Sequence, residues 1–437
     1  MAAQPVGTAA NVPPQPGNAG LTALNAERAM LFQQMMRDPA NLDLAFKYAE
    51  LSSRAGDLEA AISTLERMLI FAPNVARLKL ELGVLYFRLG SYKLARSYFD
   101  SALQMADVPQ AVKAKIDLYR AAIEKKTETR SFSGSITFGS RYQTNANAGP
   151  QNDIVNLNGL DYILNKGALA DPDTNGFVAA RFHYRQLLPT QGDAFDVDLL
   201  TYGALYANHH EDNTGLAELT FGPDFSLGRF GISGADLALY GILGGVILDG
   251  RTYRQSAGAG LRLSRLFDAQ DRGTFQFEYR FRDFSNSALR PTAADRTGDR
   301  FDLSGVLQHA FTNHFAVFGA VDAVRRTARQ GFDSSWEIGA SAGLSYSFDP
   351  LVPTLAGRWT ATISAGALQR NFDTADPGIN AAVAERDHEA FVRAGLTVPL
   401  AADWSVETVV DYRNVSSNYD IDAYHDTSVS LGITKRF

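Results

Sequence analysis

Few side chains in this 437-residue chain have the types and spacing that catalysis requires. There is no cysteine, so thiolate metal sites and cysteine nucleophiles are excluded. No histidine belongs to an HExxH zinc motif, and none is accompanied by a GxSxG nucleophile motif. The pattern therefore indicates neither a zinc protease nor a serine hydrolase. The seven histidines are His183, His209, His210, His309, His314, His388 and His425.

Two groups of polar residues remain as candidate reactive sites. The run from His209 to Asp212, His-His-Glu-Asp, offers metal ligands, but neighbouring side chains in an extended loop point apart, so we expect no metal there. Glu407 and Asp411 share one face of a predicted strand, four positions apart, which is too far to share a proton. We predict no catalytic residue, no metal and no cofactor, and hence a protein that is not an enzyme.

The charged residues that remain follow an alternating pattern. In GTFQFEYRFRDF, residues 273–284, aromatic residues alternate with Gln276, Glu278, Arg280 and Arg282. A strand presents successive side chains on opposite faces, so one face is apolar and the other charged. In an outer-membrane barrel the apolar face meets lipid and the charged face lines the lumen. The predicted lumen residues are Arg181, His183, Arg185, Glu278, Arg280, Arg282, Glu407, Asp411 and Arg413.

The same alternation recurs in fourteen segments between residues 131 and 437. Long polar connections such as 143–175, 284–299 and 371–387 alternate with short ones, as in barrels with short periplasmic turns and long external loops. An even number of strands returns both ends of the barrel to the periplasmic side. We predict an antiparallel transmembrane β-barrel of about 14 strands.

An internal repeat precedes the strands. Pro39, Gly56 and Ala61 recur at one constant offset as Pro73, Gly90 and Ala95, and this offset is the spacing of tetratricopeptide repeats. The fold class is therefore α+β multidomain, with α-helical repeats before the barrel. Such repeats serve either as a scaffold or as a concave peptide-binding surface. The residues predicted to line a client-binding groove are Asp43, Phe46, Glu50, Arg77, Leu80, Val84 and Phe87.

Composition changes along the chain suggest three parts: a flexible leader (1–20), a tetratricopeptide-repeat domain (21–128) and an outer-membrane β-barrel (129–437). The start has neither the basic nor the apolar region of a signal peptide, which we interpret as a removed signal. No apolar run is long enough for a spanning helix. The net charge of −7 and the lack of a basic half argue against nucleic acid as a partner.

The order of these parts resembles the surface lipoprotein assembly modulators, the Slam family, over about residues 60–437. The resemblance is carried by the helical stretch VPQAVKAKIDLYRAAIEKK, by a first strand running into Asn145-Ala146-Asn147, and by the count of fourteen strands. The last residue, Phe437, also resembles the aromatic signal read by the barrel insertion machinery. The short repeat region departs from the family.

The resemblance implies an outer-membrane translocator of a Gram-negative bacterium, with the repeats in the periplasm. Its partners would be outer-membrane lipid, the insertion machinery during biogenesis, and a client protein. That client would be a surface lipoprotein or a soluble secreted protein such as a metal or haem scavenger. Two alternatives stay open: an exopolysaccharide export porin with a periplasmic repeat scaffold, and a plain porin with an accessory domain.

Overall fold

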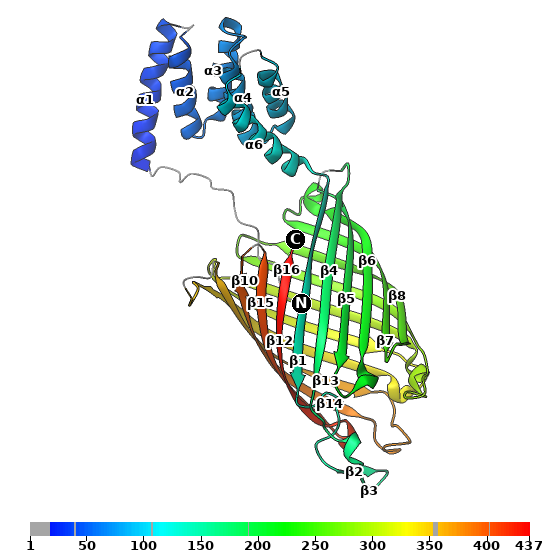
Figure 1. Cartoon of the computed structure of the whole chain (residues 1–437). Helices are drawn as coiled ribbons and strands as arrows, with labels where there is room; N and C mark the ends of the chain where they lie inside the picture. The colour runs from blue at the N-terminus through cyan, green and yellow to red at the C-terminus, as the bar shows by residue number, and fades with distance from the viewer. Residues whose placement is uncertain (1–17, 39–40, 106–107, 191, 353–356, 402) are drawn as a thin grey trace. The chain divides into compact units, whose positions relative to one another are not determined.

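The computed structural model describes residues 18–38, 41–105, 108–190, 192–352, 357–401 and 403–437. The chain divides into two compact units, residues 1–128 and residues 129–437 (Figure 1). Of the leader predicted at residues 1–20, only 18–20 are described, and they open the first helix. The rest of the predicted leader lies outside the described residues.

Six α-helices make up the described part of the first unit. α2, α4 and α6 begin at residues 42, 76 and 110, and α3 and α5 at 58 and 92, so equivalent helices recur at a constant interval. The predicted repeat is confirmed, and α6 is the first helix of a third copy. The helices are α1 (Asn18–Arg37), α2 (Leu42–Arg54), α3 (Leu58–Phe71), α4 (Ala76–Arg88), α5 (Tyr92–Leu103) and α6 (Gln110–Thr127).

Local sequence explains where these helices turn and how closely they pack. Gly56 and Gly90 end the first helix of each pair at φ +86° and +81°, a backbone conformation that favours glycine. Inside the pair α4–α5, a Cβ on Gly83 would lie 2.4 Å from the fully buried ring of Phe99. Close approach of the two helices therefore requires a small residue at this position.

Three residues predicted to line the client groove face α6 instead. Leu80 is only 3% exposed and lies in one buried cluster with Ile116 of α6. Val84 and Phe87 pack against the same cluster, and the Phe87 ring meets Tyr119 edge-on at 5.2 Å. The prediction for Leu80 is wrong because α6 covers it, and Val84 and Phe87 are half-buried by the same helix.

The other four predicted groove residues lie on α2 and α4. Asp43, Glu50 and Arg77 are exposed, and Phe46 is half-buried. The Arg77 guanidinium lies 4.8 Å from the centre of the Phe46 ring, a cation–π contact that joins the two helices. Whether this surface holds a client stays a prediction.

The second unit is a closed antiparallel barrel of fourteen strands, as predicted (Figure 1). β1 pairs with both β4 and β16, which closes the ring. The strands are β1 (Arg130–Gln143), β4 (Asp173–Leu187), β5 (Ala194–Tyr206), β6 (Thr214–Ser226), β7 (Ala235–Leu248), β8 (Arg251–Leu266), β9 (Asp271–Phe284), β10 (Gly298–Ala310), β11 (Phe315–Arg326), β12 (Ser335–Phe348), β13 (Trp359–Phe372), β14 (Arg386–Pro399), β15 (Trp404–Ser417) and β16 (Tyr424–Arg436).

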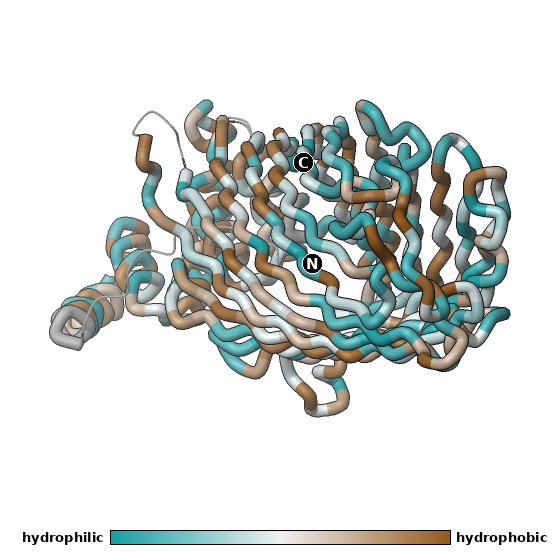
Figure 2. The backbone as a smooth tube through the Cα atoms, turned by 90° about the horizontal axis from the view of Figure 1, so that it is seen from below, coloured by the Kyte–Doolittle hydropathy of each residue, from teal (hydrophilic) through white to brown (hydrophobic). Residues whose placement is uncertain are grey.

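Each strand carries two different faces, and hydrophobic and hydrophilic residues follow one another along the tube in Figure 2. Large apolar side chains stay exposed on one face, including Phe138 at 58%, Val321 at 61% and Ile338 at 67%. A water-soluble sheet would cover this belt of exposed apolar side chains, because large exposed apolar patches are unfavourable in water.

At the seam where β1 and β16 close the ring, Phe437 exchanges backbone hydrogen bonds with Gly134, and its ring lies near Phe132.

The two ends of the barrel differ in their connections. The three longest, 144–172, 285–297 and 373–385, lie at the same end. Several other connections at that end are short, against the predicted alternation. The shortest is Asp249-Gly250, which joins β7 to β8 with φ +50° and +68° as a tight hairpin turn requires. The longest connection also contains a small hairpin that the alternation did not predict, β2 (Ile154–Leu157) with β3 (Leu160–Ile163).

Candidate functional site: the charged interior of the barrel

A hydrogen-bonded ion pair identifies the interior face of the wall. Arg280 of β9 donates to both carboxylate oxygens of Glu218 of β6, with Nη2 3.3 Å from Oε1. β7 and β8 separate these strands in the sheet, so the two backbones are about 14 Å apart along the wall. Their side chains can meet only across the concave side, so both point into the barrel.

The pairing register extends this assignment around the ring, because directly opposite residues share a face. Glu218 lies opposite Leu200, which lies opposite Arg181 on β4. Followed strand by strand, the register puts all nine residues predicted to line the lumen on the face that carries Arg280. That this interior holds water and conducts ions stays a prediction.

Most of these nine side chains are paired with an opposite charge on a neighbouring strand. His183 Nδ1 lies 2.9 Å from Asp198 of β5, and Arg185 lies 3.1 Å from Asp196 of β5 and also 3.1 Å from Asp224 of β6, one strand further along. On the other side of the seam the distances are 2.9 Å for Glu407–Arg436, 2.8 Å for Asp411–Arg393 and 3.3 Å for Arg413–Glu389. Arg181 is exposed on β4. The interior is thus a network of cross-strand ion pairs.

Arginines are concentrated on one part of this wall. Arg280, Arg300 and Arg326 lie directly opposite one another on β9, β10 and β11. Like charges in register repel, so each arginine needs carboxylates nearby. Arg300 pairs with Asp302 at 2.6 Å, and Arg326 with Glu337 at 2.9 Å.

Sequence reasoning included Arg280 in this row but missed Arg300 and Arg326, and it also missed Arg254, which lies on β8 opposite Phe284 and outside the row. Their strands lack the strict aromatic alternation of β9, and only the register between strands brings them together.

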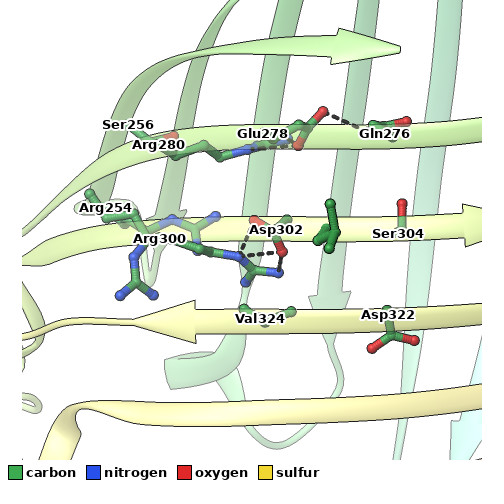
Figure 3. Close-up of a pocket in the computed structure, with 12 residues that line it drawn as sticks. Arg254, Ser256, Gln276, Glu278, Arg280, Arg300, Asp302, Ser304, Asp322 and Val324 are labelled. Carbon is green, nitrogen blue, oxygen red and sulfur yellow. Dashed lines mark hydrogen bonds and ion pairs between the residues drawn. The ribbon is translucent and has the colours of Figure 1, made fainter. Parts of the chain in front are cut away.

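Among the described residues, we consider two cavities that open on the interior face. One, of about 280 Å³, lies on the wall formed by β8 to β11 (Figure 3). Its lining combines arginines with carboxylates, and Arg254, Glu278, Arg280, Arg300, Asp302 and Asp322 are among the residues shown. A second, of about 500 Å³, lies where β14, β15, β16 and β1 meet the long loop, lined by Asn145, Arg393, Asp411 and Arg413 among others.

One match to GxSxG does occur, at residues 339–343, so the expectation that the chain lacks this motif is wrong. In the structure Ser341 lies inside the regular strand β12, opposite Ala320 and Gly366. A nucleophile elbow needs a sharp turn between a strand and a helix, which exposes the serine. This serine has no such setting.

The polar run 209–212 folds differently from our expectation. A short 3₁₀ turn, η2 (His210–Asp212), brings ligand atoms of His209, Glu211 and Asp212 within 4.8 Å of one another, so the prediction that they point apart is wrong. Both His209 nitrogens are occupied, by Glu211 at 3.2 Å and Asp171 at 3.0 Å. Burial of the ring opposes its charge, but these two carboxylates outweigh burial and raise the pKa of His209.

The turn Asn145-Ala146-Asn147 fastens both ends of the long loop. The Asn145 amide donates to the Gly149 carbonyl at 2.8 Å and to the His425 carbonyl at 3.3 Å. The Asn147 amide donates to Leu169, where the loop returns. These side chains therefore join the loop to itself and to the start of β16.

The β2–β3 hairpin lies against neighbouring loops. Asn158 N donates to the Ile379 carbonyl at 2.8 Å, and Asn156 N donates to Asp420 at 3.1 Å. These partners belong to the loops that follow β13 and β15. The hairpin is therefore tied to two other loops at the same end of the barrel.

Comparisons with known proteins give distant likenesses only. No protein-family model and no curated protein matches the sequence. Among solved structures, a bacterial polysaccharide outer membrane secretin is 10% identical over 70% of this chain and 98% of its own, with TM-score 0.36. An outer membrane channel from Pseudomonas putida F1 is 11% identical over 71% of this chain and 98% of its own, with TM-score 0.36.

The helical repeats have their own likenesses. The type III secretion chaperone SycD of Yersinia enterocolitica, in complex with a peptide of the translocator YopD, is 13% identical over 25% of this chain and 86% of its own, with TM-score 0.23. None of the described helices is both long and apolar enough to cross a membrane. The chain is similar to outer-membrane barrels in one unit and to helical-repeat proteins in the other.

Proposed function

We propose that this protein is an outer-membrane barrel that moves a client protein across the outer membrane. The exposed apolar belt around a closed barrel supports a lipid environment, since such a belt is favourable only outside water. The paired charges of the interior support a polar route. The client would be a surface lipoprotein or a soluble secreted protein such as a metal or haem scavenger.

The observation that carries the proposal is the direct fusion of the two units. α6 ends at Thr127 and β1 begins at Arg130, so only Glu128 and Thr129 separate a repeat helix from the first barrel strand. A client held by the repeats would be tethered close to the barrel, which raises its effective concentration there without any further contact. In this proposal the repeats lie in the periplasm of a Gram-negative bacterium.

The client surface that we propose is the α2–α4 face bearing Asp43, Phe46, Glu50 and Arg77. It offers a half-buried aromatic ring, a cation stacked on that ring and two exposed acidic groups. Helical repeats form extended concave binding surfaces, and aromatic residues and arginine are enriched at protein interfaces. Leu80 is not part of this surface, because α6 covers it.

The test is reconstitution in a heterologous Gram-negative host, with a working signal sequence and each secreted or lipidated protein encoded beside this one. Surface labelling and immunoblots of the medium are the readouts. We expect one neighbour to reach the surface or medium with the intact chain, and to fail when residues 18–128 are deleted. No movement of any neighbour, with the barrel verified as inserted, would refute the proposal.

A charge-reversed surface sharpens the test. Arg77→Glu with Glu50→Lys changes the α2–α4 face, while Lys93→Glu on the exposed part of α5 changes charge elsewhere in the repeats. We expect only the first variant to lose export. If both variants export equally well, the α2–α4 face is not the surface that holds the client, whether or not the protein translocates one.

Export of an exopolysaccharide is the second candidate, and the concentration of arginines on the interior wall from β8 to β11 favours it. Guanidinium groups bind carboxylates and other oxyanions of acidic sugars well. Deletion of the gene would then lower the acidic polysaccharide in the medium and leave neighbouring proteins in place.

A further inference from the structure

Four arginines line the cavity on the wall from β8 to β11, but only two of them have carboxylate partners. Arg280 pairs with Glu218 and with Glu278 at 2.7 Å, and Arg300 pairs with Asp302. Arg254 and Arg282 make no ion pair with any residue in the described part of the chain. Two positive charges on this wall are therefore uncompensated by a direct neighbour.

Arg282 is the more constrained of the two. It is only 7% exposed, its Nε has no partner among the described atoms, and its Nη2 makes one long hydrogen bond, 3.4 Å, to the Thr327 carbonyl. Arg254 is half-buried, and its Nε likewise lacks a partner within the described ranges. A guanidinium has five N–H donors, and leaving several of them buried without acceptors is unfavourable.

A single aromatic ring holds both of these side chains in place. The Phe284 ring centre lies 6.0 Å from the Arg254 guanidinium carbon and 5.6 Å from that of Arg282. A cation–π contact uses the flat face of a guanidinium and leaves its N–H edges unbound. Phe284 therefore positions two guanidinium groups without satisfying their donors.

The carboxylates of the cavity do not accept hydrogen bonds from Arg254 or Arg282, because Asp302 and Glu278 are bonded to other residues. Asp302 receives three hydrogen bonds from Arg300, and Glu278 is bonded by Arg280, Gln276 and Tyr240. Asp322 lies at the other end of the cavity from Arg254 (Figure 3). The Arg254 end of the cavity thus combines unsatisfied donors, positive charge and open volume.

We propose that Arg254 and Arg282 form a binding site for an oxyanion, a carboxylate or sulfate-like group, inside the barrel. Such an anion accepts hydrogen bonds from the free N–H groups of both guanidiniums and compensates their two positive charges. The cavity has room for one such group with its nearest substituents. This site is independent of the proposed client, because free anions and anionic groups on a longer chain present the same chemistry.

The test uses the full-length protein purified in detergent at low ionic strength, where charge interactions are least screened. Isothermal titration calorimetry with sodium sulfate probes a free anion, and titration with a triglutamate peptide probes carboxylates on a chain. The variants are Arg282→Gln and Arg254→Gln. Arg229→Gln, in the β6–β7 connection and paired there with Asp193, removes the same charge outside the cavity.

We expect binding of at least one probe, weakened about tenfold by either cavity variant and unchanged by Arg229→Gln. Sulfate binding would identify a free-anion site, and binding of triglutamate alone would identify a site for carboxylates on a chain. Absence of binding to the native protein, or equal affinity in all variants, would overturn the proposal. If Arg282→Gln does not fold, the less buried Arg254→Gln decides the matter.

Discussion

Arg280 of β9 donates hydrogen bonds to Glu218 of β6 across the two strands that lie between them. The same guanidinium also bonds Glu278 on its own strand at 2.7 Å. One side chain therefore braces three strand intervals of the wall from the inside. Such a brace favours the curvature that a closed barrel needs.

Removal of this brace is expected to destabilise the barrel. Arg280→Gln leaves Glu218 and Glu278 without their cation in a largely buried setting, which we expect to lower the free energy of unfolding by about 1–3 kcal/mol. Urea unfolding in lipid or detergent, followed by tryptophan fluorescence, measures it. Arg393→Gln is the matched control, because Arg393 is 53% exposed in its pair with Asp411 and should cost under about 1 kcal/mol. Equal losses would contradict the bracing role.

A second prediction concerns close packing in the repeats. Gly83→Ala puts a Cβ 2.4 Å from the ring of Phe99, which is fully buried and cannot swing into solvent. We expect overpacking to cost about 1–3 kcal/mol and to speed protease cleavage within residues 42–127 of the full chain. Lys93→Ala, on an exposed position of α5, should leave the cleavage rate unchanged. A rate equal to that of the native protein in Gly83→Ala would show that α4 and α5 can separate at low cost.

The sequence predicts repeated local patterns well. The alternation in β9 and in the thirteen other barrel strands is a property of each single strand. The constant interval between equivalent helices is a property of the repeated sequence. Both patterns can therefore be recognised without knowing any long-range contact. The barrel and its strand number follow from them. The hairpin β2–β3 was missed because its strands have four residues each, although Asn158-Gly159 is a strong turn signal between them.

Contacts between distant segments could not be predicted in this way. Leu80 occupies a repeat position that often faces a groove, and only the packing of α6 shows that it is covered. The pairing of Arg280 with Glu218 depends on the curvature of the wall, and the gathering of Arg254 with Arg282 depends on the register of β8 with β9. No single segment contains that information.

A third prediction tests the Asn145-Ala146-Asn147 turn. Asn145 is 2% exposed, and its side chain bonds Gly149 twice and His425 once. Asn145→Ala leaves those backbone groups unsatisfied, which we expect to cost about 1–3 kcal/mol locally. Hydrogen–deuterium exchange of peptides from residues 145–171 should become faster. Asn414→Ala on β15, whose amide donates to Ser416 at 3.3 Å in an exposed position, should leave that exchange unchanged.

The last prediction concerns pH and the loop before β14. Burial, followed by the charges of Asp422 and Asp387, raises the pKa of Glu385 to about 9, so the folded protein keeps this carboxyl protonated at neutral pH. The unfolded chain releases that proton at pH ~4.3. Between these values the folded state binds more protons than the unfolded state, so its stability falls as pH rises.

Glu385→Gln should remove this dependence, because the amide resembles the protonated acid. We expect the variant to exceed the native protein in free energy of unfolding by about 1–3 kcal/mol at pH 8, with a smaller difference at pH 5. Urea midpoints at pH 5, 6, 7 and 8 measure the effect. Glu211→Gln is a control of opposite sign, since hydrogen bonds from its own backbone amide and from His209 lower the pKa of Glu211. Loss of the Glu211 charge in this control should destabilise the loop at pH 8. A pH profile of Glu385→Gln equal to that of the native protein would refute the assignment of a buried, protonated Glu385.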